Sequence, residues 1–123
     1  MSLTKEQWEC LAVFAGADLL GEFGKDVRGD LYPIRLVGSF TNGWHPNSDW
    51  RDFGPLWMKL EQWKRDNVIF DGDDGAYTPT PVAGLVDEQL AAFYAAIDMC
   101  KEQELMQAGC ELGAAIGKAM RGV

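Results

Sequence analysis

The chain has 123 residues, which fits one domain of common size, and 47% of them are hydrophobic, which argues against intrinsic disorder. Its formal net charge of −8 argues against a nucleic-acid or anionic-membrane partner bound through a basic face. The acidic residues are spread along the chain, so the sequence alone marks no single acidic face.

The three cysteines, Cys10, Cys100 and Cys110, cannot all pair, and none lies in a Cys-x-x-Cys unit. Buried free thiols in a reducing compartment are the better interpretation. The first residues show no signal-peptide pattern, and the weakly polar stretch 105–120 is too short and too charged to span a bilayer. These features predict a cytoplasmic protein with no membrane partner.

The first predicted element is a helix over residues 4–23. Thr4 and Gln7 have the spacing of a capping box, in which each side chain bonds the other residue's backbone N–H. Apolar residues then recur at helical spacing from Trp8 to Phe23, and the glycines at 21 and 24 are expected to close the helix.

An extended segment is expected over residues 31–40, which are rich in β-branched and aromatic side chains. Pro33 lacks a backbone N–H, so an edge strand or an irregular extended piece fits better than a central strand. The turn signal Thr41-Asn42-Gly43 follows, and then a loop that contains Trp44 and His45.

A second helix is predicted over residues 49–66, with Asn47 or Ser48 as the N-cap and Asp49 favourably placed against the helix dipole. Trp50, Trp57 and Trp63 belong to its apolar stripe. Pro55 conflicts with a straight helix, so the sequence predicts a kink or a restart at that residue.

Residues 68–78 read as a β-hairpin around the loop Asp71-Gly72-Asp73-Asp74-Gly75. A third helix is expected over 86–107, followed by a glycine-spaced helical tail over 109–121. One unbroken helix through both would be about 50 Å long, so a break near 108–109 is favoured over an end that meets another chain. The predicted fold is α+β, with three main helices packed on a small antiparallel sheet.

Candidates for chemistry are few. The acidic loop 71–75 fails the EF-hand pattern and reads as a solvated hairpin tip. His45 is the only histidine, and with Asp49 it does not form a metal-ligand or catalytic set, so we predict no metal, no cofactor and no catalytic residue. The cysteines lack basic neighbours that would activate a thiol. Trp44, His45 and Asp49 remain candidates for contact with a ligand or partner.

The spacing of Gly109, Gly113 and Gly117 puts three missing side chains on one helix face. In a soluble chain this spacing favours one close intramolecular helix contact, because glycine costs helix stability that packing must offset. The alternative is a homodimer formed through the same face, a use known from membrane helices.

The block Pro46 to Trp57, PNSDWRDFGPLW, resembles the polar Ser/Thr-Asp helix entry of small phage and prophage proteins, the NinX-like and related αβα-sandwich families. In those proteins the entry leads a helix, a short β-hairpin and an alanine-rich closing helix. In this chain the hairpin corresponds to residues 68–78 and the alanine-rich helix to residues 90–97. The resemblance therefore covers about residues 44–100. These families have no assigned activity, and the resemblance implies no catalytic residues.

Three functions follow as hypotheses. The first is a non-enzymatic accessory protein of phage or prophage origin that acts by protein–protein association, with another protein or with itself. The second is a small-ligand binder or enzyme whose site lies at the loop 41–47, with Trp44 as a stacking wall. The third is an acidic DNA mimic, which needs carboxylates at duplex-like spacing on one face.

Overall fold

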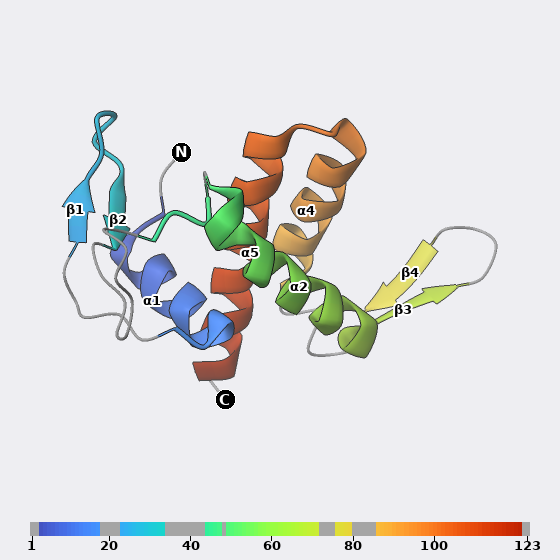
Figure 1. The fold of residues 1–123 in the computed structure, drawn as a ribbon. Helices are drawn as coiled ribbons and strands as arrows, with labels where there is room; N and C mark the ends of the chain where they lie inside the picture. The colour runs from blue at the N-terminus through green and yellow to red at the C-terminus, as the bar shows by residue number, and fades with distance from the viewer. Residues whose placement is uncertain are drawn as a thin grey trace.

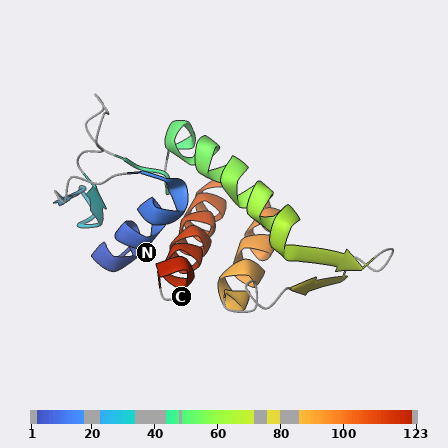
Figure 2. The ribbon, with the colours of Figure 1, turned by 90° about the horizontal axis from the view of Figure 1, so that it is seen from below.

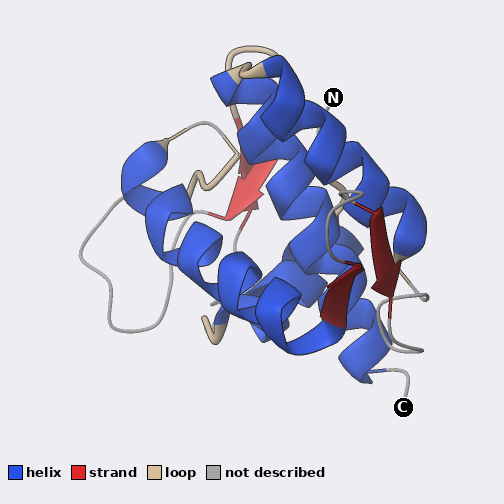
Figure 3. Cartoon of the chain, turned by 90° about the vertical axis from the view of Figure 1, so that its right-hand side faces the viewer, coloured by secondary structure: helices blue, strands red, loops and turns tan. Residues whose placement is uncertain are grey.

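The computed structural model describes residues 3–17, 23–33, 44–47, 49–71, 76–79 and 86–121. Within these ranges the chain forms four helices and two separate pairs of antiparallel strands (Figures 1 and 3). The predicted α+β class is confirmed. The element count differs from the expected three main helices and one sheet, since the C-terminal segment supplies two full helices and the strands form two ladders.

Helix α1 spans Lys5–Ala15 and begins with the predicted capping box. The Gln7 N–H donates to the Thr4 hydroxyl oxygen at 3.1 Å, and the Gln7 amide oxygen accepts the Thr4 N–H at 2.8 Å. The predicted end near residue 23 is wrong. Gly16 adopts a left-handed φ of 73°, and its N–H bonds the carbonyls of the last turn, which ends the helix there.

Strands β1 (Phe23–Lys25) and β2 (Leu31–Pro33) form an antiparallel pair. Phe23, expected at the end of the first helix, therefore opens a strand instead. The extended segment 31–40 is a strand at its start, and 34–40 lie outside the described residues. The indole N–H of Trp8 donates to the Leu31 carbonyl oxygen at 2.9 Å, which ties β2 to α1.

Helix α2 spans Trp50–Asn67, within one residue of the prediction at each end. Asp49 caps its first turn, because the Asp49 carboxylate accepts the Arg51 N–H at 2.9 Å. The cap is therefore Asp49 rather than Asn47. Ser48, the other predicted cap, lies outside the described residues.

Pro55 lies inside α2, which continues past it without the expected restart. The residue before it is Gly54, and a glycine has no Cβ to clash with the proline ring. Pro55 is also exposed, so the carbonyl that loses its partner is on the solvent side of the helix.

Strands β3 (Val68–Asp71) and β4 (Ala76–Pro79) pair antiparallel, with Val68 opposite Pro79 and Asp71 opposite Ala76. The predicted hairpin is thus present. The four residues between its strands lie outside the described part of the chain.

Helix α4 spans Asp87–Met99, and α5 spans Glu102–Arg121. The predicted break near 108–109 is wrong, because the chain turns at Cys100, which takes a left-handed φ of 53°. The charged stretch from Lys101 to Glu104 leads into α5, which begins at Glu102. Glycine at 109 does not break α5, because it is packed against another helix.

Helix α5 is the centre of the fold rather than a tail. Figure 2 shows α1, α5 and α4 side by side, with α2 lying across one side of the three. Gly113 and Gly117 face α1, and Gly109 faces α2, where an added Cβ would lie 2.7 Å from the Phe53 ring. At Gly117 an added Cβ would overlap the backbone carbonyl oxygen of Cys10. The glycine face of α5 is therefore filled by contacts within the chain.

The tryptophans divide differently from the expectation. Trp44 is only 7% exposed and lies against Trp8, with 5.9 Å between ring centroids, whereas Trp50 is 43% exposed. Trp57 and Trp63 are half-buried, and Trp57 packs on Phe93 of α4 rather than on a sheet. All three tryptophans of α2 lie at the margins of its apolar stripe. The centre of the stripe is formed by residues 53, 56 and 60.

No helix among the described residues is long and apolar enough to cross a membrane.

Candidate functional site

The three predicted contact residues lie together before α2, and each has a structural partner. Trp44 is buried against α1, so its ring offers no open face to a ligand. The His45 ring is half-buried and lies 4.5 Å from the ring of Tyr32. The His45 N–H donates to the Asp52 carboxylate at 2.9 Å. The hypothesis of a stacking wall at Trp44 is therefore wrong.

Asp49 caps the N-terminus of α2. Its carboxylate accepts the backbone N–H of Arg51 at 2.9 Å and pairs with the guanidinium at 3.0 Å. The hydrogen bond from the Arg51 side chain holds the pKa of Asp49 below its ordinary value, and it raises the pKa of Arg51. Asp49 and His45 are joined through their backbones, since the Asp49 N–H donates to the His45 carbonyl at 2.8 Å.

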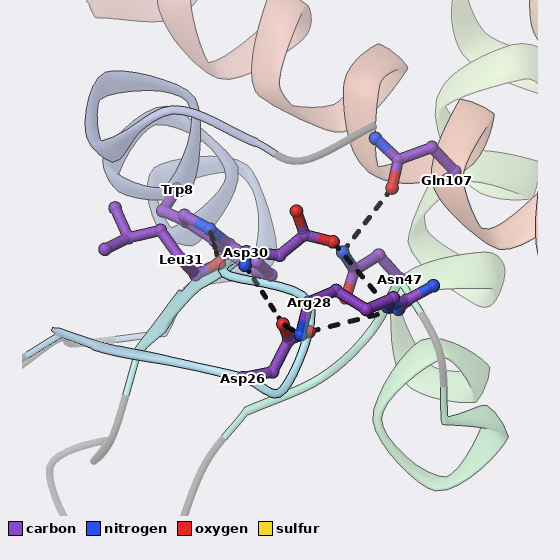
Figure 4. Close-up of polar contacts among 7 residues, drawn as sticks. All are labelled: Trp8, Asp26, Arg28, Asp30, Leu31, Asn47 and Gln107. Carbon is purple, nitrogen blue, oxygen red and sulfur yellow. Dashed lines mark hydrogen bonds and ion pairs between the residues drawn. The ribbon is translucent and has the colours of Figure 1, made fainter.

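The β1–β2 turn carries a charged cluster that the sequence analysis did not identify (Figure 4). The Asp26 carboxylate accepts the backbone N–H groups of Arg28 and Asp30 at 2.8 and 2.9 Å. The bond from Asp30 is the main cause that lowers the pKa of Asp26. The Arg28 side chain lies 3.9 Å from the Asp26 carboxylate and 3.9 Å from the Asp30 carboxylate. It is 64% exposed, so it remains available to solvent.

Side-chain amides join this region to α5. Asn47 donates to the Gln107 amide oxygen at 3.4 Å (Figure 4). Gln107 in turn donates to the Glu111 carboxylate at 3.2 Å. The first bond is long, so it leaves both amides able to bond a third group.

A cleft of about 440 Å³ opens at this junction, between the β1–β2 turn, α4 and α5. Its lining combines small and thioether side chains with amide and charged groups. The residues that line it are Arg28, Asp30, Asn47, Ala92, Ala96, Met99, Gln103, Glu104, Gln107, Ala108 and Glu111.

A second cleft of about 410 Å³ continues along the same face of α5, between α1 and α4. It is lined by Glu6, Gln7, Cys10, Gln89, Glu111, Ala114, Ala115 and Lys118. Glu111 borders both clefts, which therefore adjoin along α5 and are together called here the α5 groove. At 100° per residue, the lining positions of α5 lie on the side opposite Gly113, so the groove and the glycine contacts occupy opposite faces of that helix.

The charges of the α5 groove leave the Glu111 carboxylate near its middle. At the ends, Arg28 lies near Asp30, and Lys118 lies 3.5 Å from Glu6. Midway along α5, Glu111 accepts the Gln107 amide and has no ion pair with a described basic residue. Glu104, which lines the first cleft together with Arg28, has a loose 3.8 Å contact with exposed Lys101. The groove therefore suits a ligand with positive charge and with groups that bond amides.

The cysteines differ in environment. Cys10 is buried at the edge of the second cleft, and the Arg121 guanidinium donates to its sulfur at 3.6 Å. Cys110 is fully buried; burial, followed by the charge of Glu111, raises the pKa of its thiol well above the ordinary value. Cys100 is exposed, so the expectation that all three are packing residues is wrong for this one.

Within the described part of the chain, no three residues among histidine, cysteine, aspartate and glutamate lie close enough to hold a metal ion. Of the acidic loop 71–75, which fails the EF-hand pattern, only Asp71 is among the described residues, and residues 72–75 lie outside them. His45 borders neither of the two clefts.

The α5 groove does not follow from the spacing of Gly109, Gly113 and Gly117, which was the pattern used to interpret the last helix. A signal was present: Glu104, Gln107, Glu111 and Lys118 are three, four and seven residues apart, which is helical spacing, on a helix otherwise rich in small residues. That spacing places polar groups on one face, although it cannot tell which neighbours flank that face.

Comparison with known proteins adds no relative: no family model, no curated protein and no solved structure matches the chain.

Proposed function

We propose that this chain is a cytoplasmic, non-enzymatic accessory protein that acts by binding a basic segment of another protein in the α5 groove. A phage or prophage origin is part of the proposal, and it rests on the resemblance of residues 44–100 alone. The observation that carries the proposed function is that two adjoining clefts lie along α5 and that both are bordered by the Glu111 carboxylate.

The dimensions of the groove support a polypeptide ligand. From Glu104 to Lys118 the axis of α5 covers about 21 Å at 1.5 Å per residue. An extended chain rises about 3.3 Å per residue, so about six residues would lie along this length. The two cleft volumes, about 410 and 440 Å³, are each of the size that ligand sites commonly have.

The lining chemistry supports an extended and positively charged segment. The amides of Asn47, Gln103 and Gln107 offer donors and acceptors to a peptide backbone. Glu104 and Glu111 offer carboxylates to lysine or arginine side chains. The lining alanines, Ala92, Ala96 and Ala108, have short side chains and leave room for a main chain to approach closely.

The test measures fluorescence anisotropy of two labelled peptides of about six residues, one alternating lysine with alanine and the other glutamate with alanine. The lysine peptide is expected to bind, and more weakly as salt is raised, because exposed charge pairs are screened. The double variant Glu104→Gln/Glu111→Gln should weaken binding about two- to thirtyfold, since each of the two exposed ion pairs contributes about 0.2–1 kcal/mol.

Glu9→Gln/Asp98→Asn is the matched control, because it removes two exposed carboxylates that do not line the groove. The control should bind as the unmodified protein does. Failure to bind the lysine peptide at low salt, or an equal loss in both double variants, contradicts the proposal. The second outcome would mean that net charge, rather than the groove, attracts the peptide.

A further inference from the structure

We infer that the first cleft of the α5 groove binds an apolar side chain of the docked segment, and that Met99 is the residue that determines this specificity. The first cleft is the one of about 440 Å³ between the β1–β2 turn, α4 and α5. The inference rests on the proposed function, because it concerns the same basic segment, and it narrows the ligand class. The segment would carry a bulky apolar residue two positions from the lysine or arginine that meets Glu111.

Met99 differs from the other exposed apolar side chains because it lines a cleft. The large hydrophobic residues that are exposed in the described part of the chain are Val13, Val27, Trp50, Met58, Met99 and Met120. Met99 is 53% exposed and lines the first cleft, whereas the others line neither cleft of the α5 groove. The exposed surface of Met99 is therefore the one that a ligand in the groove would cover.

The apolar part of the first cleft comes mainly from one stripe of α4. At about 100° per residue, Ala92, Ala96 and Met99 fall within about 60° of one another around the helix axis. All three line the first cleft, together with Ala108 of α5. Ala96 and Ala108 are buried, whereas Ala92 is exposed. The short side chains that share the cleft with Met99 leave space for a longer apolar side chain of a ligand.

Met99 lies toward the end of the first cleft that is farther from Glu111. Helices α4 and α5 lie side by side and are joined by the turn at Cys100, so Met99 lies near the start of α5 (Figure 1). The lining residues Gln103 and Ala108 precede Glu111 by about 12 and about 4.5 Å along the axis of α5. The apolar stripe of α4 therefore borders the groove over this interval.

An extended segment reaches this interval with the side chain two positions from the one that meets Glu111. Alternate side chains of an extended chain point to the same side and lie about 6.6 Å apart. That distance falls between the levels of Ala108 and Gln103 along α5. The residue next to the cation would point away from the groove. The geometry therefore predicts an apolar residue and a basic residue separated by one position, in either chain direction.

The chemistry of methionine suits a class of apolar side chains rather than one shape. Its side chain is unbranched, has three rotatable bonds and carries a polarisable sulfur, so it adapts to aliphatic and aromatic partners. A leucine buries more apolar surface in such a cleft than an alanine does. Because the first cleft is open to solvent, partial burial should strengthen binding about three- to tenfold relative to alanine.

The experiment measures fluorescence anisotropy with peptides derived from the lysine–alanine peptide of the proposed function. The first or the last lysine is replaced by leucine, and each such peptide is compared with one that has alanine at the same position, so that the charge is equal. At least one leucine peptide should bind about three- to tenfold more tightly than its alanine counterpart. Met99→Gln should remove this preference and leave binding of the lysine–alanine peptide unchanged, because glutamine has a similar length and no charge. Met99→Leu should keep the preference.

Met58→Gln is the matched control. Met58 is 73% exposed on α2 and lines neither cleft, so this variant should prefer leucine as the unmodified protein does. Met58 and Met99 are both exposed, so neither change is expected to unfold the chain, and circular dichroism checks this.

Three outcomes overturn the inference: neither leucine peptide binds more tightly than its alanine counterpart, Met99→Gln keeps the preference, or Met58→Gln loses it to the same extent. If the lysine–alanine peptide binds and Glu104→Gln/Glu111→Gln weakens it while leucine adds nothing, the proposed function stands and only this inference fails. If only a leucine peptide binds, and Met99→Gln abolishes that binding, the proposed function fails and the apolar specificity of the first cleft stands.

Discussion

Glu111 lies where the two clefts along α5 meet, and its surroundings explain why it stays available to a ligand. It accepts the Gln107 amide at 3.2 Å, and no ion pair joins it to a described basic residue. Arg28 and Lys118 lie at the two ends of the groove, each near another carboxylate. The local pairing of the terminal charges therefore leaves the negative charge concentrated in the middle.

Asp26 shows how one exposed carboxylate organises a turn. Its charge is stabilised by two backbone N–H groups, chiefly that of Asp30, and its pKa is lowered in consequence. Because the folded pKa is lowered, the stabilisation is fully present above the unfolded pKa. It is lost as the pH falls through the folded value, below about pH 4.

Asp26→Asn should accordingly lower the urea midpoint of unfolding at pH 7, and the difference from the unmodified chain should shrink as the pH is lowered below about 4. The asparagine oxygen can still accept the N–H groups of Arg28 and Asp30. The pH dependence therefore isolates the contribution of the Asp26 charge to stability. Glu9→Gln, on the exposed side of α1, is the control and should show no comparable pH-dependent difference. A deficit that is equal at pH 7 and at acid pH would contradict the assignment.

At the scale of elements, the two opposite faces of α5 make different contacts. Its glycine face allows α1 and α2 to approach closely, and the opposite face forms the groove floor. The contacts at the three glycines are unequal. At Gly109 an added Cβ would meet the Phe53 ring, a side chain that can move, whereas at Gly117 it would meet the backbone of Cys10.

Gly117→Ala should therefore lower the free energy of unfolding by about 2 kcal/mol or more, because overpacking against a backbone outweighs the gain of up to about 1 kcal/mol in helix propensity. Gly109→Ala should cost less. Chemical denaturation of both variants measures the difference. Ala119→Gly, on the same helix, calibrates the propensity change. A Gly117→Ala protein as stable as the unmodified chain would show that α1 and α5 are not in this contact.

At the scale of the whole molecule, α5 joins the other helices, so exposure of its buried face requires the fold to open. Cys110 lies on that helix and is fully buried, while Cys100 lies exposed at the turn before it. The reactivity of Cys100 therefore reports on the native protein, whereas the reactivity of Cys110 reports on opening of the fold.

Alkylation with iodoacetamide, followed by peptide mass spectrometry, should modify Cys100 rapidly in the native protein. Cys110 should react only as the chain unfolds, because burial both blocks its thiol and raises its pKa. The urea dependence of its labelling should follow loss of the circular dichroism signal, as expected for a cooperative single domain. Equal native rates for the two cysteines would contradict the central position of α5.

Several elements could be predicted from the sequence because their signals are local. The capping box of Thr4 and Gln7, the bounds of α2 and the pairing of β3 with β4 each depend on residues a few positions apart. The limits of α1 and of α4 could not be predicted in this way. Both depend on one residue in a left-handed conformation, Gly16 and Cys100, and a cysteine is a rare choice at such a position.

The sequence by itself determined the α+β class, the start of α1, the bounds of α2, the pairing of β3 with β4, and the small side chains that α5 presents. Only the tertiary structure decided that Trp44 is buried while Trp50 is exposed, and that Glu104, Gln107 and Glu111 line a groove. The physical reason is that periodicity gives the face on which a residue lies. Burial depends on the neighbours that other segments, such as Trp8 of α1 or Asn47 of the loop, bring to that face.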